Sequence, residues 1–146
     1  MKENKYRVLD KTEISLSLLK TLFEKVGESY PDFDYWLEQK VLSDLKLGNR
    51  DLIISSIKGE IAGFVLTKDS EKKVCTIFVK PEYRNKGIAD KLLRISKEKL
   101  GTNYPKLTVG KKNYPMFKKL FDKHNFKITK EIKGYYKPEE TEIFFN

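Results

Sequence analysis

The stretch VCTIFVKPEYRNKGIADKLL, residues Val74–Leu93, decides the fold that we predict for this chain. It starts as an apolar run of strand length, breaks at Pro81, crosses a short basic segment and then continues with apolar residues at helical spacing. Because proline has no amide hydrogen to give to a strand ladder, Pro81 ends the strand and releases the chain into a turn. One face of the strand would carry Val74, Thr76 and Phe78, and the other Cys75, Ile77 and Val79. With both faces mostly apolar, we expect a central strand that is covered on both sides.

The turn after Pro81 has the features of an anion site. The leading amide hydrogens of the next helix, whose first turn we place near 85–89, have no intrahelical acceptor, and the helix dipole adds partial positive charge. Gly87 leaves the backbone open to a ligand, and Arg84 and Lys86 add two cations at the rim. These donors suit a pyrophosphate. Strand-to-helix joints with a glycine are common, however, so the turn alone is weak evidence.

The rest of the chain reads as strand, helix, helix, three-strand meander, helix, strand, helix and two strands. Asp10 and Glu13 resemble a capping box that starts the first helix, Asp34 is a candidate N-cap for the second, and Gly48 is its expected stop. The residue ranges that we expect are 5–10 for an edge strand, 14–26 and 35–47 for two helices, 51–57, 61–67 and 73–80 for an antiparallel meander, 87–100 for a helix, 106–110 for a fifth strand, 115–124 for a last helix with Asn125 as a left-handed stop, and 126–132 and 141–145 for two closing strands.

Length and composition favour one globular domain, residues 1–146, with an α/β fold. The chain has no apolar run long enough for a membrane span and no apolar signal peptide, so we expect a cytoplasmic protein. With one cysteine and one histidine it has no disulfide, and we expect no metal site. The net charge of +9 fits a polyanionic partner, but nucleic acid is not favoured because 26 of the 30 basic residues are lysines spread along the chain.

The segment RNKGIA, Arg84–Ala89, resembles the Arg/Gln-x-x-Gly-x-Gly/Ala signature of the Gcn5-related N-acetyltransferase (GNAT) superfamily. The preceding IFVKPEY is similar to the strand end that leads into that signature, and the predicted order of elements is similar to that of the family over most of the chain. The resemblance implies a mostly antiparallel sheet whose fourth and fifth strands splay apart. It also implies an acetyl-CoA-dependent N-acetyltransferase in which a substrate amine attacks the thioester directly in a ternary complex.

Roles for individual residues follow from the same resemblance. The family's fourth strand pairs with pantetheine like an additional strand, the signature loop holds the pyrophosphate through its amides, and a main-chain amide near Val79 would stabilise the oxyanion. An asparagine that contacts pantetheine lies one position from Asn113 in register. The coenzyme-binding residues implied are Ile77, Phe78, Val79, Arg84, Asn85, Lys86, Gly87, Ile88, Ala89 and Asn113.

The catalytic acid and base are where the sequence departs from the family. Phe121 occupies the register of the usual tyrosine acid and has no proton to donate. Tyr114, about two helical turns earlier, is a candidate substitute, and solvent water is the alternative. No carboxylate lies on the fourth strand, and a water chain ending at Cys75 or Thr76 is a further possibility for the base. The other carboxylates considered, which we expect to be solvated, are Asp34, Glu38, Glu60 and Glu71.

The acceptor is an amine that the sequence does not name: a small molecule, a peptide N-terminus or lysine, or an aminoacyl-tRNA. Aromatic residues that would line its site, or else pack in the core, are Tyr30, Phe33, Trp36 and Tyr135. We expect His124 to lie on the surface at the end of the last helix. Two rival interpretations are a degenerate module that binds acyl-CoA without turnover and a basic nucleic-acid-binding domain. The expected assembly is a monomer or a homodimer.

Overall fold

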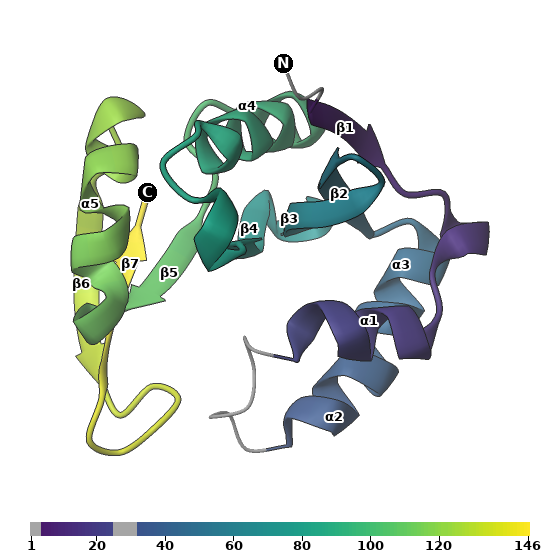
Figure 1. Cartoon of the computed structure of the whole chain (residues 1–146). Coiled ribbons are helices and arrows are strands. Elements are labelled where there is room, and N and C mark those ends of the chain that lie inside the picture. The colour runs from purple at the N-terminus through teal and green to yellow at the C-terminus, as the bar shows by residue number, and fades with distance from the viewer. Residues whose placement is uncertain (1–3, 25–31) are drawn as a thin grey trace.

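The computed structural model of the chain describes residues 4–24 and 32–146. It contains two sheets: a four-stranded one in the order β1-β2-β3-β4 and a three-stranded one in the order β5-β7-β6 (Figure 1). Helix α4 lies on one face of the first sheet, helices α1 to α3 lie on the other, and α5 covers the second sheet. The predicted α/β fold is confirmed, and so is the splay of the fourth and fifth strands.

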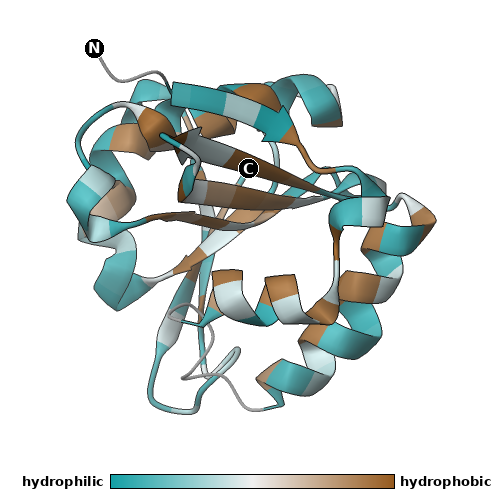
Figure 2. Ribbon diagram, turned by 45° about the vertical axis from the view of Figure 1, so that its right-hand side comes forward, coloured by the Kyte–Doolittle hydropathy of each residue, from teal (hydrophilic) through white to brown (hydrophobic). Residues whose placement is uncertain are grey.

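The meander forms as predicted because short polar turns join apolar strands. Strand β1 (Asn4–Val8) pairs with β2 (Arg50–Ile57), which pairs with β3 (Glu60–Lys68) and then β4 (Lys73–Val79), all antiparallel. Lys58 and Gly59 take positive φ angles in the tight β2–β3 turn, the conformation that a two-residue hairpin loop requires. Figure 2 shows the inner strands as the hydrophobic centre of the molecule and β1 as a hydrophilic edge.

Two apolar cores cover the faces of the first sheet. On one face, α4 (Ile88–Leu100) buries Ile88, Leu92 and Leu93 against the sheet. On the other, α1 (Leu16–Phe23) and the second helix pack around Phe23 and Phe64, whose ring centroids are 4.9 Å apart. Full burial of one such side chain stabilises the fold by roughly 1.5–3 kcal/mol. The sheet is therefore fixed from both sides, apart from its β4 edge.

Strand β4 departs from the predicted pattern in two ways. It is the edge of the four-stranded sheet and not a central strand, and its residues from Cys75 to Phe78 are only half-buried. In addition, Leu66 pairs with Thr76 and Thr67 with Val74, which leaves Cys75 as the extra residue of a β-bulge. The bulge reverses the alternation, so Val74 packs with Ile77 and Val79 on the α4 side, while Cys75 and Phe78 face α1 to α3.

The first helix begins later than predicted, and the second begins earlier. Asp10 and Glu13 do form a capping box, but it caps a 3-10 turn, η1 (Lys11–Glu13); α1 starts afterwards, with Ser15 as its cap. The second helix starts at Phe33 with Asp32 in a left-handed N-cap position, so Asp34 lies inside it. Its continuous segments are α2 (Phe33–Trp36), the π-helical turn η2 (Leu37–Leu42) and α3 (Ser43–Leu47), stopped by Gly48 as predicted. Val26 and Tyr30 lie outside the described residues.

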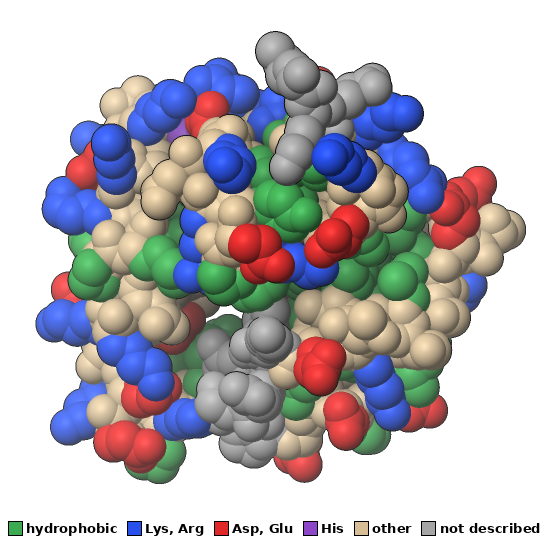
Figure 3. Space-filling model, viewed as in Figure 1, with side chains coloured by type: hydrophobic (Ala, Val, Ile, Leu, Met, Phe, Trp, Pro, Cys, Tyr) green, Lys and Arg blue, Asp and Glu red, His purple; other side chains and the backbone are tan. Residues whose placement is uncertain are grey.

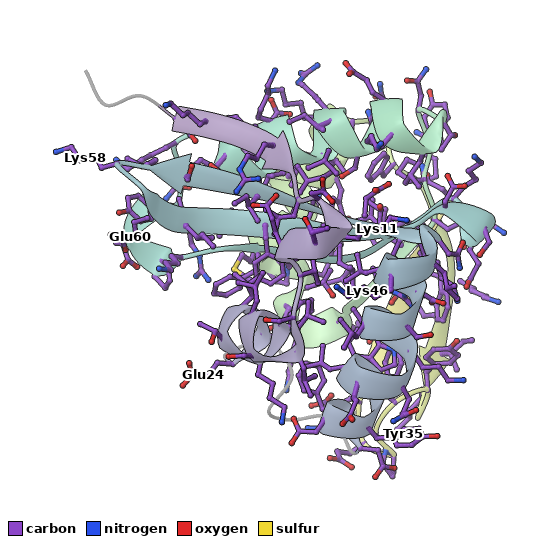
Figure 4. All side chains as sticks on the ribbon, turned by 90° about the vertical axis from the view of Figure 1, so that its right-hand side faces the viewer. Lys11, Glu24, Tyr35, Lys46, Lys58 and Glu60 are labelled. Carbon is purple, nitrogen blue, oxygen red and sulfur yellow. The ribbon has the colours of Figure 1, made fainter. Side chains whose placement is uncertain are left out.

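Side chains from this region fasten the helices to the start of the chain. In Figure 4, Lys46 on α3 points toward the turn of Lys11, whose carbonyl oxygen accepts a hydrogen bond from its Nζ at 2.6 Å. Tyr35, on α2, lies at the far end of the continuous second helix and is 63% exposed. None of the helices in the described parts of the chain is both long and apolar enough to span a membrane.

The second sheet closes the C-terminal part of the chain. Strand β7 (Thr141–Phe145) lies between β5 (Leu107–Gly110) and β6 (Ile128–Lys133), and α5 (Tyr114–Lys123) follows the 3-10 turn η5 (Lys111–Asn113). Asn125 takes the predicted left-handed conformation after α5, with φ 59°.

His124 lies in the interior, contrary to the expectation of a surface position, and is 6% exposed. Its Nε2 is 2.7 Å from Asp90 Oδ1 on α4, and its Nδ1 is 2.6 Å from Lys97 Nζ. Because the Lys97 ammonium can only donate, Nδ1 accepts and the ring proton sits on Nε2, where it bonds the carboxylate. These two contacts with side chains of α4 hold His124 in the interior. They also join the end of α5 to α4.

Candidate active site

A cleft of about 860 Å³ runs between the two sheets where β4 and β5 separate. The two strands meet at one parallel bridge, between Lys73 and Lys106, with Val74 N donating to Lys106 O at 2.9 Å, and then diverge. In Figure 3 the surface is hollowed between the part formed by α5 and the part formed by β4. The cleft is lined by Phe33 and Trp36 from α2 and by Phe117 and Phe121 from α5, so it reaches both faces of the sheet.

One wall of the cleft is the free edge of β4. Lys80 N donates to Ala62 O on β3 at 2.9 Å, so the main-chain groups of the preceding residue, Val79, face away from β3. Those of Ile77, two residues earlier, face the same way. Among the described residues no strand pairs with this edge beyond the bridge at Lys73. We call the edge from Ile77 to Val79, together with the loop 84–87 that continues it beyond the cleft lining, the main-chain wall.

The loop after β4 leaves the start of α4 open. Pro81–Tyr83 form a 3-10 turn, and α4 begins at Ile88, so residues 84–87 precede the helix. The first turn of the helix, predicted near 85–89, therefore starts about three residues later than expected. Gly87 is the N-cap, with φ 83° and no side-chain cap, and a Cβ placed there would meet nothing within 4 Å. The leading amides of a 13-residue helix are therefore open at a position that only glycine adopts without strain.

Arg84 turns back toward β4 instead of extending from the rim. Its Nε donates to Val79 O at 3.0 Å, and its guanidinium lies 5.9 Å from the centre of the Phe78 ring. The guanidinium thus satisfies the free carbonyl at the end of the strand and places a positive charge beside the cleft. Of the predicted coenzyme-binding residues, Ile77, Phe78, Arg84 and Asn113 line the cleft, whereas Val79, Asn85, Lys86, Gly87, Ile88 and Ala89 lie outside its lining.

The opposite wall is made of side chains, and its centre is Glu142. Gly110 on β5 and Ile132 on β6 lie opposite Glu142, which is only 8% exposed. Thr108 Oγ1 donates to Glu142 Oε2 at 2.8 Å. Burial raises the pKa of Glu142, and the hydrogen bond from Thr108 acts in the opposite direction. We call Thr108, Gly110 and Glu142 on this side, with Tyr135 and with Phe33 and Trp36, which reach the cleft from α2 on a face of the first sheet, the side-chain wall.

The predicted aromatic residues serve the core and the cleft together. Phe33 and Trp36 pack against Phe23 with ring centroids 6.1 and 6.3 Å away, and both line the cleft. Tyr135 is 50% exposed and its ring stands edge-on to Phe144 at 4.9 Å. It projects from the β6–β7 loop onto the same cleft.

Arg50 and Cys75 form a polar cluster at the end where β4 and β5 meet. Arg50 is 6% exposed, with Nε 2.9 Å from Asp44 Oδ2 and Nη1 3.3 Å from the Cys75 sulfur. Burial raises the pKa of the Cys75 thiol despite the nearby guanidinium, so the thiol stays protonated at neutral pH. A protonated, half-buried thiol is a poor nucleophile, although the residue lines the cleft.

The acid candidates occupy different environments. Phe121 is 2% exposed and its ring packs on Phe126 and Phe145, so the usual tyrosine register is a core position here. The ring of Tyr114 also packs on Phe145, at 5.5 Å, and is not part of the cleft lining. Asp34, Glu38, Glu60 and Glu71 are exposed, as expected, with Glu71 paired to Lys68 at 2.6 Å.

Sequence reasoning missed Glu142, which lies in the predicted closing strand TEIFF. In a half-buried strand an isolated glutamate usually marks the solvent face. The signal that was available is Phe144, two residues later on the same face, because a solvent face seldom alternates glutamate with phenylalanine. Thr108 carried no signal, since its role depends on a strand that is distant in the sequence.

Comparison with known proteins agrees with this architecture. Residues 24–133 match the family described as acetyltransferase (GNAT) domain. The chain belongs to the GNAT acetyltransferase family. A curated N-alpha-acetyltransferase from Saccharolobus solfataricus is 43% identical over 67 residues, a match that spans 43% of this chain and 40% of that protein.

Solved GNAT structures share the fold over nearly the whole chain. The ribosomal-protein-S18-alanine N-acetyltransferase from Escherichia coli superposes with a TM-score of 0.75 at 20% identity, covering 98% of this chain and 92% of that one. Arabidopsis thaliana Naa50, in complex with the bisubstrate analogue CoA-Ac-MVNAL, gives 0.72 at 18% identity, covering 98% and 97%. Family membership supports acetyl transfer as the general activity and does not favour the rival interpretations without turnover or coenzyme.

Proposed function

We propose that this GNAT protein transfers the acetyl group of acetyl-CoA to the α-amino group of a peptide or protein N-terminus. The observation that carries the proposal is one continuous cleft with an open strand edge on one wall and a buried carboxylate on the other. The names of two structural neighbours that match nearly the whole chain favour a protein α-amine over a small amine or an aminoacyl-tRNA. On the face shown in Figure 3, Lys and Arg side chains are interspersed with Asp and Glu.

The residues of the main-chain wall fit acetyl-CoA. The open edge at Ile77, Phe78 and Val79 offers main-chain groups to the amides of pantetheine, and Asn113 lies across the cleft from it. The uncapped start of α4 at Gly87 offers amides to the pyrophosphate, with the remaining loop residues Asn85 and Lys86 beside it. Acetyl-CoA supplies the thioester that the acceptor amine attacks directly in a ternary complex.

A cleft that reaches both faces of the sheet suits that ternary complex. Coenzyme on the main-chain wall and an acceptor on the side-chain wall would meet where β4 and β5 separate. A main-chain amide that faces away from β3, at Ile77 or Val79, would stabilise the oxyanion. With phenylalanine at position 121, the departing thiolate would take its proton from solvent or from Tyr114. Unchanged turnover in Tyr114→Phe would exclude that tyrosine.

The acceptor residues are proposed from the same geometry. Phe33, Trp36 and Tyr135 would hold the first side chains of the peptide, because aromatic side chains bind extended chains at low entropic cost. Tyr30 is proposed from the sequence alone. The outcome to measure is acetylation of a peptide with a free N-terminus against the same peptide with a blocked one.

The coenzyme part of the proposal is tested by a matched pair of glycine variants. Gly87 and Gly48 both have φ 83°, and a Cβ on either meets nothing within 4 Å. Gly87→Glu and Gly48→Glu therefore carry the same backbone strain, about 1–2 kcal/mol. Only the first puts a carboxylate at the proposed pyrophosphate site. We expect calorimetric titration to show at least tenfold weaker acetyl-CoA binding for Gly87→Glu and unchanged binding for Gly48→Glu.

Equal effects of the two variants would contradict the pyrophosphate site, and absence of binding to the wild type would contradict the coenzyme itself. Binding without acetylation of any free amine would instead favour a module that binds acyl-CoA without turnover. Acetylation of aminoacyl-tRNA that weakens steeply with salt would move the acceptor from peptides to RNA.

A further inference from the structure

The carboxylate of Glu142 has one open oxygen. Oε2 accepts the hydrogen bond from Thr108, but within the described parts of the chain Oε1 has neither a hydrogen-bond donor nor a salt-bridge partner. Among these residues no fully buried side-chain oxygen lacks a partner, so Oε1 is not sealed and keeps access to the cleft. Its neighbour is Gly110, where a Cβ would lie 3.8 Å from Oε1. The absence of a side chain at position 110 leaves that space open.

A comparison with Asp90 shows how unusual this arrangement is. The carboxylate oxygens of Asp90 accept hydrogen bonds from the side chains of His124, Arg94 and Lys123, with donor–acceptor distances of up to 3.2 Å. Although burial alone would raise its pKa, these three donors lower it to about 2. Glu142 is more buried and has one neutral donor, so nothing offsets its desolvation in the same way. A carboxylate that served only the fold would be paired as Asp90 is.

The other charged groups around Glu142 do not compensate for its burial. Glu140 raises its pKa through repulsion, and Lys73 on β4 lowers it without approaching to salt-bridge distance. Lys111 and Lys112 on η5 are paired with Glu131 and Glu140, respectively. The charged groups on the neighbouring elements are thus Lys73, Lys111, Lys112, Lys130, Glu131, Lys133 and Glu140. The cation missing beside Oε1 is one that a ligand can supply.

We propose that Glu142 takes the proton from the ammonium group of the acceptor and that Thr108 positions its carboxylate for that step. The inference rests on the proposed function and adds the base that the sequence did not reveal. An α-ammonium group is a compact cation with three donors, which suits one open carboxylate oxygen at the floor of a cleft. A general base is most effective when its pKa lies close to the working pH, which burial favours here.

Proton transfer to Glu142 and acetyl transfer together conserve atoms and charge. An N–H bond of the ammonium breaks and its proton joins Glu142 Oε1, which leaves a neutral amine. The nitrogen lone pair forms the C–N bond to the acetyl carbon, and the C–S bond breaks to release the coenzyme thiolate. A second proton leaves nitrogen and reaches the thiolate by way of solvent. Glu142 then loses its proton to water, so each turnover releases one proton.

The test compares Glu142→Gln with Glu131→Gln, an exposed glutamate on the neighbouring strand β6. Gln can still accept the Thr108 hydrogen bond but cannot take a proton. We expect kcat/KM of Glu142→Gln at pH 7 to fall by about 10²–10⁴, with acetyl-CoA affinity unchanged by calorimetry. The deficit should shrink as the pH approaches the pKa of the acceptor amine, because the amine is then already neutral. Glu131→Gln should behave as wild type.

Thr108 variants provide a second readout that a purely structural role would not move. Thr108→Val removes the donor that stabilises the carboxylate, so the acidic limb of the pH profile of kcat/KM should move to higher pH. Thr108→Ser keeps the hydroxyl, so the acidic limb of its pH profile should lie at the same pH as in the wild type.

An active wild type with an equally active Glu142→Gln would overturn the role of Glu142 and leave the proposed function intact. So would a loss that is uniform across pH. A wild type that binds acetyl-CoA and acetylates no amine at any pH would overturn both.

Discussion

The two walls of the cleft are built on opposite principles. The main-chain wall uses backbone groups of one short segment, from Ile77 to Gly87. Its side chains mainly have to leave these backbone groups accessible to a ligand. The side-chain wall gathers groups from β5, β7, α2 and the β6–β7 loop, which are far apart in the sequence. A ligand common to a whole family can be held by backbone, whereas the acceptor must be distinguished by side chains. We therefore expect substitutions in the two walls to separate coenzyme affinity from acceptor turnover.

The largest effect should come from a pair of glycine-to-alanine substitutions, one on the strand behind the main-chain wall and one in the side-chain wall. A Cβ at Gly63 on β3 would lie 2.8 Å from Phe78 O and 3.3 Å from Val79 Cα, so the edge of β4 has to move. We expect Gly63→Ala to cost about 1–3 kcal/mol of stability and to weaken acetyl-CoA binding at least tenfold. Denaturant unfolding and calorimetry measure the two quantities.

The partner in this comparison is Gly110→Ala, whose Cβ would make ordinary contacts at 3.8 Å with Glu142 Oε1 and at 3.9 Å with Asn113. It should keep stability within about 1 kcal/mol and coenzyme affinity unchanged, but lower acceptor turnover by shielding Oε1. If both variants weakened the same parameter, the division of labour between the walls would be wrong.

A smaller effect is expected from the aromatic part of the side-chain wall. Tyr135→Ala should raise the KM for a peptide acceptor about fivefold, equivalent to roughly 1 kcal/mol, and leave acetyl-CoA affinity alone. Tyr104→Ala is its control, because Tyr104 is similarly exposed, at 55% against 50%, but does not line the cleft. Steady-state kinetics with a varied peptide concentration measures the difference. An equal rise in both variants would remove Tyr135 from the acceptor site.

The smallest effect concerns the contact that joins the helices behind the two walls. Burial, followed by the nearby cations, lowers the pKa of His124 in spite of Asp90. A lowered pKa means that the unfolded chain binds the proton more readily, so the contribution of His124 is present above about pH 6.5 and is lost as the pH falls through its folded pKa. We expect Tm to fall by a few degrees between pH 7.5 and 5.5.

Because His124 is the single histidine of the chain, its substitution is a clean control. His124→Gln should flatten the dependence of Tm on pH over this range. A slope that survives in the variant would assign the effect to other groups.

The fold was largely predictable because its signals are local. Alternating strands, short polar turns, Gly48 and Asn125 each act within a few residues, and the meander and closing strands follow from them. The bulge at Cys75 was not predictable, because an extra residue in a strand leaves the apolar pattern intact while it reverses the faces. The start of α1 was missed because the capping box at Asp10 satisfies a 3-10 turn equally well.

The same difference between local signals and long-range pairings decides which parts of the site could be predicted. Gly87 belongs to one contiguous motif, so its place between β4 and α4 was predicted from the sequence. The splay that frees the edge of β4 was implied only by the resemblance, because the apolar pattern of the strand itself predicted a central position. Glu142 and Thr108 acquire their relation only when β7 inserts between β5 and β6. Likewise, the burial of His124 depends on Asp90 and Lys97, which lie 34 and 27 residues away. Chemistry that depends on such pairings needs the three-dimensional structure.

The position of Trp36 has a practical consequence. It is the single tryptophan of the chain, it lines the cleft, and the Arg50 guanidinium lies 5.8 Å from its ring centre. Indole emission responds to the polarity and the charges around the ring, so the protein carries an intrinsic fluorophore in its side-chain wall. A peptide that settles beside Trp36 should change the emission, whereas coenzyme on the opposite wall should change it less. Acceptors can therefore be screened by fluorescence on the unlabelled protein.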